Sequence, residues 1–422
     1  MATPAHHPQT LAERLIVRTI EWTWLLWLVG GLYIAGPVLG WVLAAMVATS
    51  LYLGRSDITV IPRPVLVWLG SMAVMLIILW IGHFNFDLGP AKTLKSSIGW
   101  AKGWALIALF PLAGAMLAVR PEVIYRAVCR LGLVTLILLP IFLFAPSLGL
   151  PERLWVSPLK IVGGAGTEYF AAQLFTIEPG IGRVRWQFFA PWSPAAGMMG
   201  VIYAYLAAKE RNLFWKTIGI TAGVALAILS QSRVAYIALI MVAPMVWTAA
   251  RLNRGYLWMA AAPAMLALGF FGPALLELID SFVAEFYAAR ADSSRVRAAL
   301  GRIAIDRWQN EAYWFGHGIV ENGPHLVEYM PIGSHHSWYG LLFVKGLTGA
   351  IALAVPLTFT AIYLALRSSS NKMARLGLAM VIFLILYSMS ENLEMLAYLY
   401  WPALIMIGIA FRPICERAAI NG

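Results

Sequence analysis

The sequence predicts an all-α, polytopic membrane protein with about 12 transmembrane helices, and three observations support this fold class. Hydrophobic residues make up 61% of the 422-residue chain and charged residues only 12%, whereas an ordinary soluble domain has about 25% charged residues. Apolar runs of the roughly 20 residues that a spanning helix needs recur along the whole chain. Basic residues are concentrated between some of these runs and are sparse between others. We therefore expect one membrane domain over residues 1–422.

The first part of the chain is expected to hold five spans. The run from Trp22 to Leu53 is too long for one helix and is interrupted at Gly30-Gly31 and Gly36-Pro37, which predicts two helices joined by a tight turn. A loop is then expected from His83 to Ser97, and an irregular extramembrane loop, rich in glycine, from Pro146 to Ala190. The other three spans are expected at about Pro64–Ile81, Gly99–Val119 and Leu131–Ala145.

The second part is expected to hold seven spans and a large polar loop over residues 272–337. Within this loop, residues 292–308 predict a helix that Ser293 or Ser294 would cap. Val296, Leu300 and Ile303 form its apolar stripe. The spans are expected at about Pro191–Ala208, Phe214–Leu229, Val234–Ala250, Tyr256–Phe271, Trp338–Leu366, Leu376–Ser390 and Leu396–Phe411.

The charge distribution predicts the orientation, because loops retained in the cytoplasm carry excess Lys and Arg. Of the 31 basic and 20 acidic residues, 17 and 6 lie on the side of the N-terminus, which leaves 14 of each elsewhere. This asymmetry places both termini in the cytoplasm and the large loop outside, in the periplasm of a Gram-negative cell. Because the basic residues cluster at helix ends, the net charge of +11 does not indicate a nucleic-acid partner.

Several arginines are candidates for binding phosphate, since a guanidinium recognises phosphate oxygens with a planar fork. Arg295, Arg297 and Arg302 lie on the predicted loop helix, and Arg233 lies at the boundary between two spans. The alternatives are a solvated helix whose arginines pair with nearby carboxylates, and an arginine at a helix end that extends toward the membrane surface. These patterns alone leave both readings open.

The paired histidines His335 and His336 are candidates for proton transfer, because imidazole titrates near neutral pH. They precede Trp338 and Tyr339, which are typical of the membrane interface. A metal site is the competing interpretation, but His317, His325 and this pair lack a compact ligand spacing, so we expect no metal. Glu391, in a short turn before the last span, and Lys345, inside a span, are possible residues of the same pocket, as is His317.

Residues 229–366 resemble the O-antigen ligase and O-antigen polymerase superfamily of bacterial membrane glycosyltransferases. Three pieces carry the resemblance: Ser232-Arg233 at the start of a span, the arginine-bearing helix that leads to Phe315-Gly316-His317-Gly318, and Gly333-Ser334-His335-His336 before a span that contains Gly346-Leu347-Thr348-Gly349. The family places a histidine eleven residues before the first of those glycines, which matches His335 better than His336. The usual histidine-asparagine pair is here a pair of histidines.

The resemblance implies a metal-independent, cofactor-free glycosyltransferase of the bacterial inner membrane. It would move a glycan from an undecaprenyl-diphosphate carrier to a hydroxyl of a glycan, of lipid A-core or of a protein. Arginines would hold the diphosphate and the loop histidine would assist the transfer. Arg233 matches the family's first arginine, and Arg295 is preferred to Arg297 for the second. Whether the enzyme is a ligase or a polymerase stays open. The alternative function is a secondary transporter or flippase, for which visible repeats in the two halves would be typical.

Overall fold

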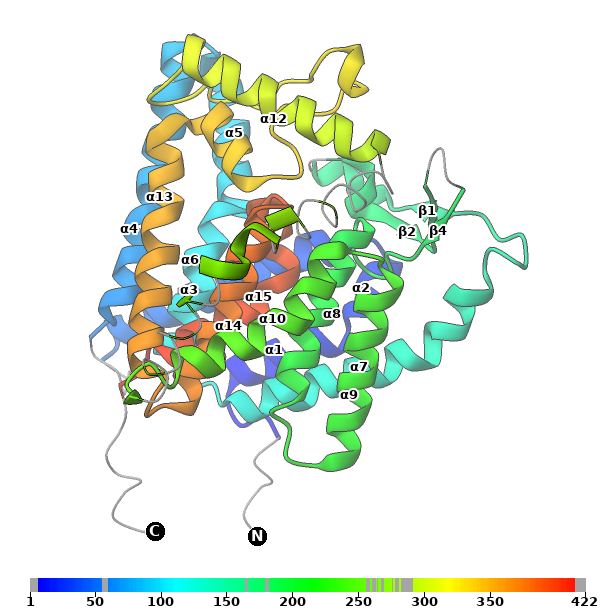
Figure 1. The fold of residues 1–422 in the computed structure, drawn as a ribbon, viewed down its shortest axis with the longest axis vertical. Coiled ribbons are helices and arrows are strands. Elements are labelled where there is room, and N and C mark those ends of the chain that lie inside the picture. Colours follow the sequence, from blue (N-terminus) through cyan, green and yellow to red (C-terminus); the bar gives the residue numbers. More distant parts are fainter. Residues whose placement is uncertain are drawn as a thin grey trace.

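The computed structural model describes residues 7–54, 60–163, 166–178, 182–255 and 291–413, with isolated positions between 256 and 290. The described chain is mostly helical, which agrees with the predicted all-α class. Most helices stand side by side in one bundle, and α12 lies across its upper end (Figure 1). The helices of the first part are α1 (Leu11–Glu21), α2 (Thr23–Leu28), α3 (Leu32–Tyr52), α4 (Arg63–Asn85), α5 (Gly89–Lys102), α6 (Trp104–Met116) and α7 (Pro121–Phe144).

The predicted break between the first two spans is confirmed at one of its two positions. The chain turns between α2 and α3 at Gly30, where φ is 68°. Gly36-Pro37, in contrast, lies inside α3. A Cβ at Gly36 would come within 2.7 Å of the Tyr398 Cα, so this glycine allows α3 to pack closely on α15 (Leu393–Ala410).

Two boundaries of the first part were predicted wrongly. The expected loop from His83 to Ser97 is mostly helical, because α4 continues to Asn85 and α5 begins at Gly89. The span expected from Leu131 is the second half of α7, which begins at Pro121. This extension includes Arg126 and Arg130, whose charges are paired with Glu210 and Glu21 and do not end the helix.

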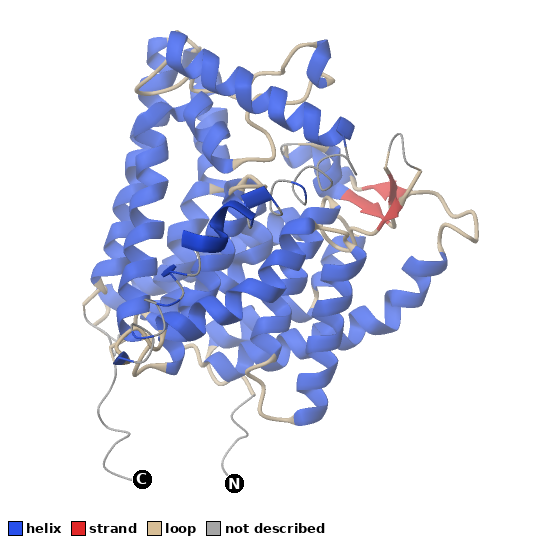
Figure 2. Ribbon diagram, in the orientation of Figure 1, coloured by secondary structure: helices blue, strands red, loops and turns tan. Residues whose placement is uncertain are grey.

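The segment between α7 and α8 (Ser193–Ala207) is irregular, as expected, but it also holds four short strands that the sequence did not predict. Strand β1 (Arg153–Val156) pairs antiparallel with β2 (Ala171–Gln173), and β3 (Thr176–Ile177) pairs antiparallel with β4 (Val184–Arg185). The strands form a small patch at the edge of the helical bundle (Figure 2). β4 is the strand that carries Arg185 toward the bundle.

The second part of the chain contains helices close to the expected ranges. They are α9 (Leu213–Leu229), α10 (Arg233–Ala249), α12 (Ala291–Glu311), α13 (Ser337–Arg367), α14 (Lys372–Ser388) and α15. The predicted loop helix is therefore confirmed as α12, although Ser293 and Ser294 lie within its first turn and do not precede it. The span expected at Tyr256–Phe271 falls largely outside the described residues.

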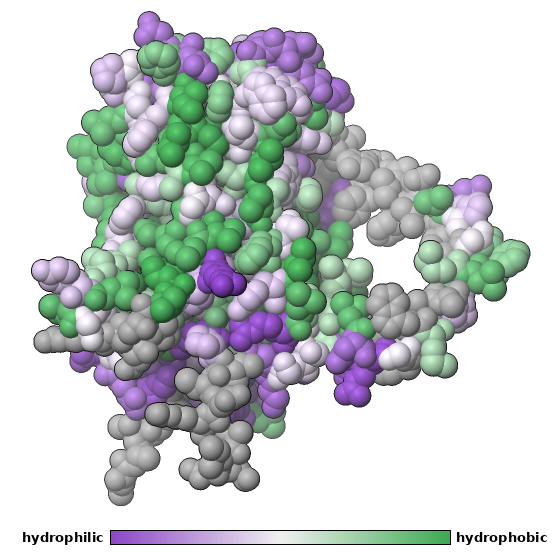
Figure 3. Space-filling view, turned by 90° about the vertical axis from the view of Figure 1, so that its left-hand side faces the viewer, coloured by the Kyte–Doolittle hydropathy of each residue, from purple (hydrophilic) through white to green (hydrophobic). Residues whose placement is uncertain are grey.

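Apolar helices of membrane-spanning length are the main feature of the bundle. In the described part of the chain, six are long and apolar enough to cross a membrane, against the twelve spans expected. They are α3, α4, the continuous stretch Gly89–Met116, α7, α13 and α15, while α9 and α10 are apolar but shorter. Figure 3 shows hydrophobic residues over the middle of one face and hydrophilic residues gathered toward its two ends. This pattern is typical of a membrane protein.

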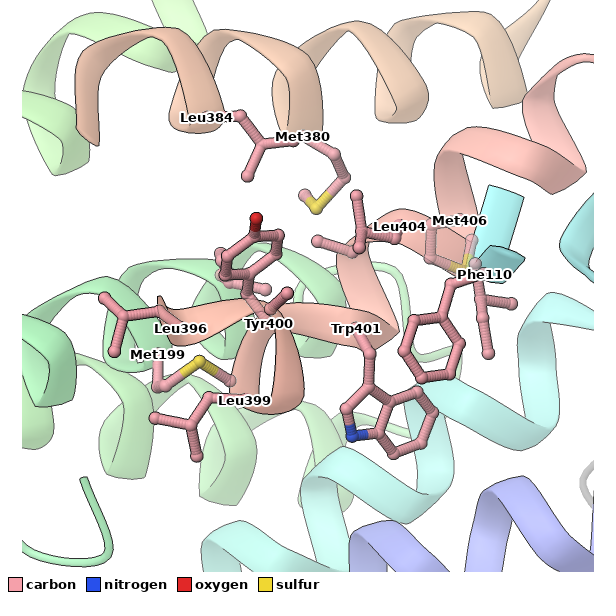
Figure 4. Packing of buried hydrophobic residues seen from close by; sticks show 14 of the residues in the cluster. Phe110, Met199, Met380, Leu384, Leu396, Leu399, Tyr400, Trp401, Leu404 and Met406 are labelled. Atoms are coloured by element: carbon pink, nitrogen blue, oxygen red, sulfur yellow. The ribbon is translucent and has the colours of Figure 1, made fainter. Parts of the chain in front are cut away.

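The core of the bundle is centred on α15. Trp401 stacks on Phe110 of α6 with ring centroids 5.5 Å apart, and Tyr400 is fully buried (Figure 4). A Cβ at Gly114 would collide with the carbonyl of Ile405, so the two helices pack backbone to backbone. Small residues at such contacts are typical of helices packed within a membrane, where close packing replaces the hydrophobic effect as the main attraction.

The first and last described residues lie at the same end of the bundle. Arg120, in the turn before α7, binds Glu13 of α1 at 2.8 Å, and the Arg412 guanidinium donates to the carbonyl of Gly114 at 2.6 Å. Arg367, at the end of α13, donates to the carbonyl of Arg412. Since the 31 residues of α13 span about 46 Å, His335 and His336 lie at the opposite end.

Candidate functional site

The histidine pair lies at the start of α13. His336 is the N-cap residue of this helix: its Nδ1 accepts from the backbone N–H of Tyr339 at 3.4 Å, and its ring stacks on the Tyr339 ring at 3.9 Å. His335 takes a left-handed backbone conformation with φ 61°. Burial lowers the pKa of both histidines to about 4, and the positive charge of Arg297 contributes at His335. Both rings are therefore neutral at pH 7 and able to accept a proton.

The turn between α14 and α15 holds the start of α13 in place. The Ser337 hydroxyl donates to the carbonyl of Glu391 at 2.7 Å and accepts from the backbone N–H of Leu393 at 2.9 Å. The backbone N–H of His336 donates to Oδ1 of Asn392 at 3.1 Å. Three hydrogen bonds, one from His336 and two at Ser337, thus join the start of α13 to a turn that lies more than 50 residues away in the sequence.

Glu391 is the buried acid of this site, with none of its surface exposed. Its Oε2 accepts a hydrogen bond of 2.7 Å from the Trp192 indole, just before α8. Its Oε1 is also buried and has no hydrogen-bond partner within the described chain. Burial raises the pKa of Glu391 to about 7, although the charges of Arg297 and Arg185 and the bond from Trp192 oppose the shift.

The three candidate arginines of α12 lie in different surroundings. The predicted apolar stripe is buried, with Val296 and Leu300 packed against Val327. A second face packs on α13, where a Cβ at Gly301 would come within 2.8 Å of the Tyr339 ring. Arg297 lies one turn before Gly301 on that face and acts electrostatically on both His335 and Glu391. Arg295 and Arg302 are exposed. The structure therefore places Arg297 near His335, whereas the motif resemblance favoured Arg295 as the diphosphate ligand.

Arg233 is the first residue of α10 and is half-buried. Ser232 caps this helix, with its hydroxyl accepting from the backbone N–H of Ala235. The carbonyl of Ser230, in the same turn, accepts from the Arg185 guanidinium at 3.2 Å. Because α10 packs on α14, and Arg185 acts on Glu391, the start of α10 belongs to the same end of the bundle as the histidine pair.

His317 and Lys345 belong to a neighbouring cluster that docks the loop onto α13. The helical conformation of α13 is interrupted at Gly346, with φ 64°. Just before this point, the carbonyl of Phe343 accepts from the backbone N–H of His317 at 2.9 Å. The His317 ring is buried, stacks on Phe343 and lies 2.7 Å from a carboxylate oxygen of Glu311. Lys345 is 3% exposed and interacts electrostatically with Glu394.

Several groups of the site were not predicted from the sequence. Trp192 and Ser337 were not singled out, because an indole and a hydroxyl near helix starts are common and carry no spacing signal. Arg307 of α12 was also missed: it binds Glu311 and Glu321 and lies 5.1 Å from the Phe343 ring centre. Its spacing of four residues from Glu311 was visible in the sequence as a helical ion pair.

A separate cavity lies near the described chain ends, away from the histidine pair. It has a volume of about 250 Å³ and is lined by Glu122, Tyr125, Arg126, Lys209, Glu210, Arg211 and Asn212. Arg126 and Glu210 form a buried ion pair of 2.9 Å within it. Among the described residues, no group of three or more His, Cys, Asp or Glu side chains is arranged to hold a metal ion.

Comparison with known proteins does not assign the chain to a family. No protein-family model matches the sequence, and no curated protein matches it.

Proposed function

We propose that this protein is a membrane glycosyltransferase that moves a glycan from an undecaprenyl-diphosphate carrier to an acceptor hydroxyl. The observation that carries the proposal is the convergence of His335, Arg297 and Glu391 at one end of the apolar bundle. These residues come from three segments that are distant in the sequence. Arg233 begins α10 at the same end, and the motif resemblance of residues 229–366 points to the same reaction.

The proposed reaction needs a proton acceptor and positive charge. The acceptor hydroxyl attacks the anomeric carbon, the bond from that carbon to the phosphate oxygen breaks, and the hydroxyl proton passes to the neutral ring of His335. The diphosphate leaves with one more negative charge, which Arg297 and Arg233 stabilise. His336, held as the N-cap of α13, positions its neighbour. In this proposal no metal ion or cofactor takes part.

The proposed location is the bacterial inner membrane. About 12 spans would leave both termini in the cytoplasm and the loop of residues 272–337 in the periplasm, where α12 and the histidine pair would meet the lipid-linked donor. Arg412 lies beside the last residue of α13 and His335 lies just before its first residue, so the two residues are at opposite ends of a membrane-spanning helix. This position and the excess of basic residues on the side of the termini support the orientation. The acceptor would be a growing glycan, lipid A-core or a protein hydroxyl.

Alanine variants in a deletion strain test the proposal. Arg233→Ala, Arg297→Ala and His335→Ala are each expected to lower glycan transfer strongly, the last by roughly 10²- to 10⁴-fold because it removes the general base. Arg153→Ala and His325→Ala, both at exposed positions, serve as matched controls. The measurement is the amount of polymerised or ligated glycan in membranes, with equal protein levels. Wild-type glycan in all three variants would contradict the proposal.

The deletion strain itself distinguishes the two forms of the reaction. If the protein is a polymerase, long chains disappear from the lipopolysaccharide or capsule profile and single repeat units remain. If it is a ligase, finished polymer accumulates on its lipid carrier. A strain that loses uptake of a solute while its glycans stay intact would instead indicate a transporter.

A further inference from the structure

Glu391 has an environment that packing alone does not explain. It is completely buried at the junction of α14 and α15, and only one of its two carboxylate oxygens, Oε2, has a hydrogen bond, from Trp192. The other oxygen, Oε1, is buried without a hydrogen-bond partner in the described chain. A buried acceptor left without a partner costs about 1–3 kcal/mol, and a buried carboxylate is retained only where positive charge compensates it. The arrangement therefore indicates a role for the charge.

Charged and polar groups from several elements act on Glu391. Two are cationic: Arg297 from α12 and Arg185 from β4. The neighbouring Tyr387 of α14 and Trp192 before α8 are neutral at pH 7. His335 and His336, also neutral, precede Ser337, whose hydroxyl donates to the carbonyl of Glu391. The negative charge of Glu391 is thus balanced by the same arginine, Arg297, that acts on His335.

We propose that Glu391 is a positioning residue that serves as the counter-ion of Arg297 and Arg185 while the site is empty, and that it takes up a proton when a diphosphate binds Arg297. This inference rests on the proposed function. A diphosphate brings at least two negative charges to a cluster with two arginines. The bound diphosphate cancels the positive charge that keeps Glu391 ionised. Its own negative charge also repels the Glu391 carboxylate, because like charges at short range in a buried site repel strongly. Protonation of Glu391 removes that repulsion.

The proton balance of a full cycle follows from this coupling. Donor binding takes one proton from solvent to Glu391. Transfer moves the acceptor's hydroxyl proton to His335 and leaves one more negative charge on the lipid diphosphate. When this product departs, Glu391 and His335 each release one proton to solvent, and the charge of Glu391 again faces Arg297. Glu391 itself forms no bond to the sugar, so it is not a catalytic residue in this scheme.

The coupling predicts how diphosphate affinity depends on pH. A carboxyl with a pKa of about 7 must be protonated before binding, which weakens the apparent affinity by about tenfold at pH 8 and about twofold at pH 7, and hardly at all at pH 6. Glu391→Gln is neutral at every pH, and its amide oxygen can still accept from Trp192. This variant is therefore expected to bind diphosphate about tenfold more tightly than the wild type at pH 8 and equally at pH 6.

Calorimetric titration of the purified full-length protein with inorganic pyrophosphate measures the coupling. Titrations in buffers of different ionisation enthalpy give the number of protons taken up on binding. At pH 7 the wild type is expected to take up about 0.5 proton more per pyrophosphate than Glu391→Gln, because about half of the carboxyls are ionised at their pKa. The difference between the two proteins cancels the protonation of pyrophosphate itself.

Trp192→Phe provides a second variant. It removes the hydrogen bond that favours the ionised carboxylate, so the pKa of Glu391 rises and more of the carboxyl is already protonated at pH 7. The excess proton uptake is expected to become smaller at pH 7 and to return at higher pH. A change in packing alone would not move the proton count in this way. Thermal unfolding of each variant checks that it is folded.

The outcomes separate this inference from the proposed function. Binding of pyrophosphate with the same proton count in the wild type, Glu391→Gln and Trp192→Phe would overturn the inference and leave the diphosphate site intact. Failure of the wild type to bind, or binding that Arg297→Ala leaves unchanged, would overturn both. Tight binding with an excess of about 0.5 proton that disappears in Glu391→Gln supports both.

Discussion

Arg295 and Arg297 lie two residues apart on α12, and an α-helix turns by about 200° over that interval. They therefore lie on different sides of the helix. Arg297 shares the face of Gly301 and Ala304, which packs on α13, and Arg295 is exposed. The free energy that each arginine contributes to an anion site depends on this difference, because a partly desolvated charge interacts more strongly than one in water.

Arg297→Ala is accordingly expected to weaken pyrophosphate binding at least tenfold, since a charge-assisted hydrogen bond contributes about 1.5–3 kcal/mol. Arg295→Ala is expected to change it by less than about threefold, because the charge it removes is exposed to solvent. Both affinities are measured at pH 6, where Glu391 is already protonated. A larger effect of Arg295→Ala would place the anion on the outer side of α12 instead.

The pKa of His335 determines a second property at this scale. Burial and Arg297 depress the pKa to about 4, so the neutral, proton-accepting ring persists far below pH 6.5. Because this pKa belongs to the protein without donor, kcat/KM for the donor is expected to stay constant from about pH 6 down to about pH 5 and to fall by half near pH 4. Rates of glycan transfer in proteoliposomes would show this. An acid limb near pH 6.5 that is absent in His335→Ala would contradict it.

The same depressed pKa affects folding stability. A histidine whose folded pKa is lower than its unfolded value stabilises the folded state above the unfolded pKa, and this contribution is lost as the pH falls toward 4. The contribution of Glu391 to folding stability changes with pH in the opposite direction. Because its folded pKa is raised to about 7, its contribution is present below the unfolded pKa of about 4.3 and is lost as the pH rises through 7.

At the scale of elements, the interruption of α13 determines how the loop after α12 docks onto this helix. At Gly346 the backbone leaves the helical conformation, and the loop after α12 occupies the gap. The backbone N–H groups of His317 and Gly318 donate to the carbonyls of Phe343 and Val344, each at 2.9 Å. In return, the N–H of Leu347 donates to the carbonyl of Tyr313 at 2.9 Å. The exchange of hydrogen bonds fixes α12, and with it Arg297, relative to the histidine pair.

Gly346→Ala tests this docking. The φ of 64° is unfavourable for a residue with a side chain, and the added Cβ would collide with the backbone of Trp314. Destabilisation by about 1–3 kcal/mol is expected, together with loss of glycan transfer. Thermal unfolding and transfer assays measure both effects. Gly70→Ala in α4, where a Cβ meets nothing within 4 Å, is the matched control and is expected to match the wild type in both assays.

At the scale of the whole molecule, the two ends of the bundle differ in charge chemistry. Near the described chain ends, arginines bind carboxylates and carbonyls of the protein itself, as Arg120 does with Glu13, Arg126 with Glu210 and Arg412 with Gly114. At the other end, Arg297 and Arg185 face a carboxylate that stays only partly ionised. The arginines of the first end are thus paired within the protein, and the second end is where we propose that a diphosphate binds.

The proposed orientation predicts opposite labelling at these two ends. A cysteine at Glu328, in the loop before α13, is expected to react with a membrane-impermeant maleimide in spheroplasts. A cysteine at Ser369, between α13 and α14, is expected to react only after the membrane is lysed. Cys129 and Cys415 are first replaced by serine. Labelling of Ser369→Cys in intact spheroplasts would reverse the orientation.

Helix positions were largely predictable from the sequence, because the length of an apolar run is a local property. The start of α13 at Ser337 lies one residue from the expected Trp338, and α9 ends at Leu229 as expected. The errors in helix boundaries arose where a charged residue pairs with a residue that is distant in the sequence. Arg126 and Arg130 appeared to end a helix, but pairing with Glu210 and Glu21 lets α7 continue through them.

The candidate site was predictable only in part, for the same reason. The sequence by itself determined the membrane class, the arginine-bearing helix and the histidine pair at the start of a span, since each depends on residues within one segment. The tertiary structure decided which arginine lies beside His335 and gave Glu391 its partners. Those contacts join residues 56 positions apart between His336 and Asn392, and 199 apart between Trp192 and Glu391. Charge and burial at such a site depend on the packing of distant helices, so no local pattern reveals them.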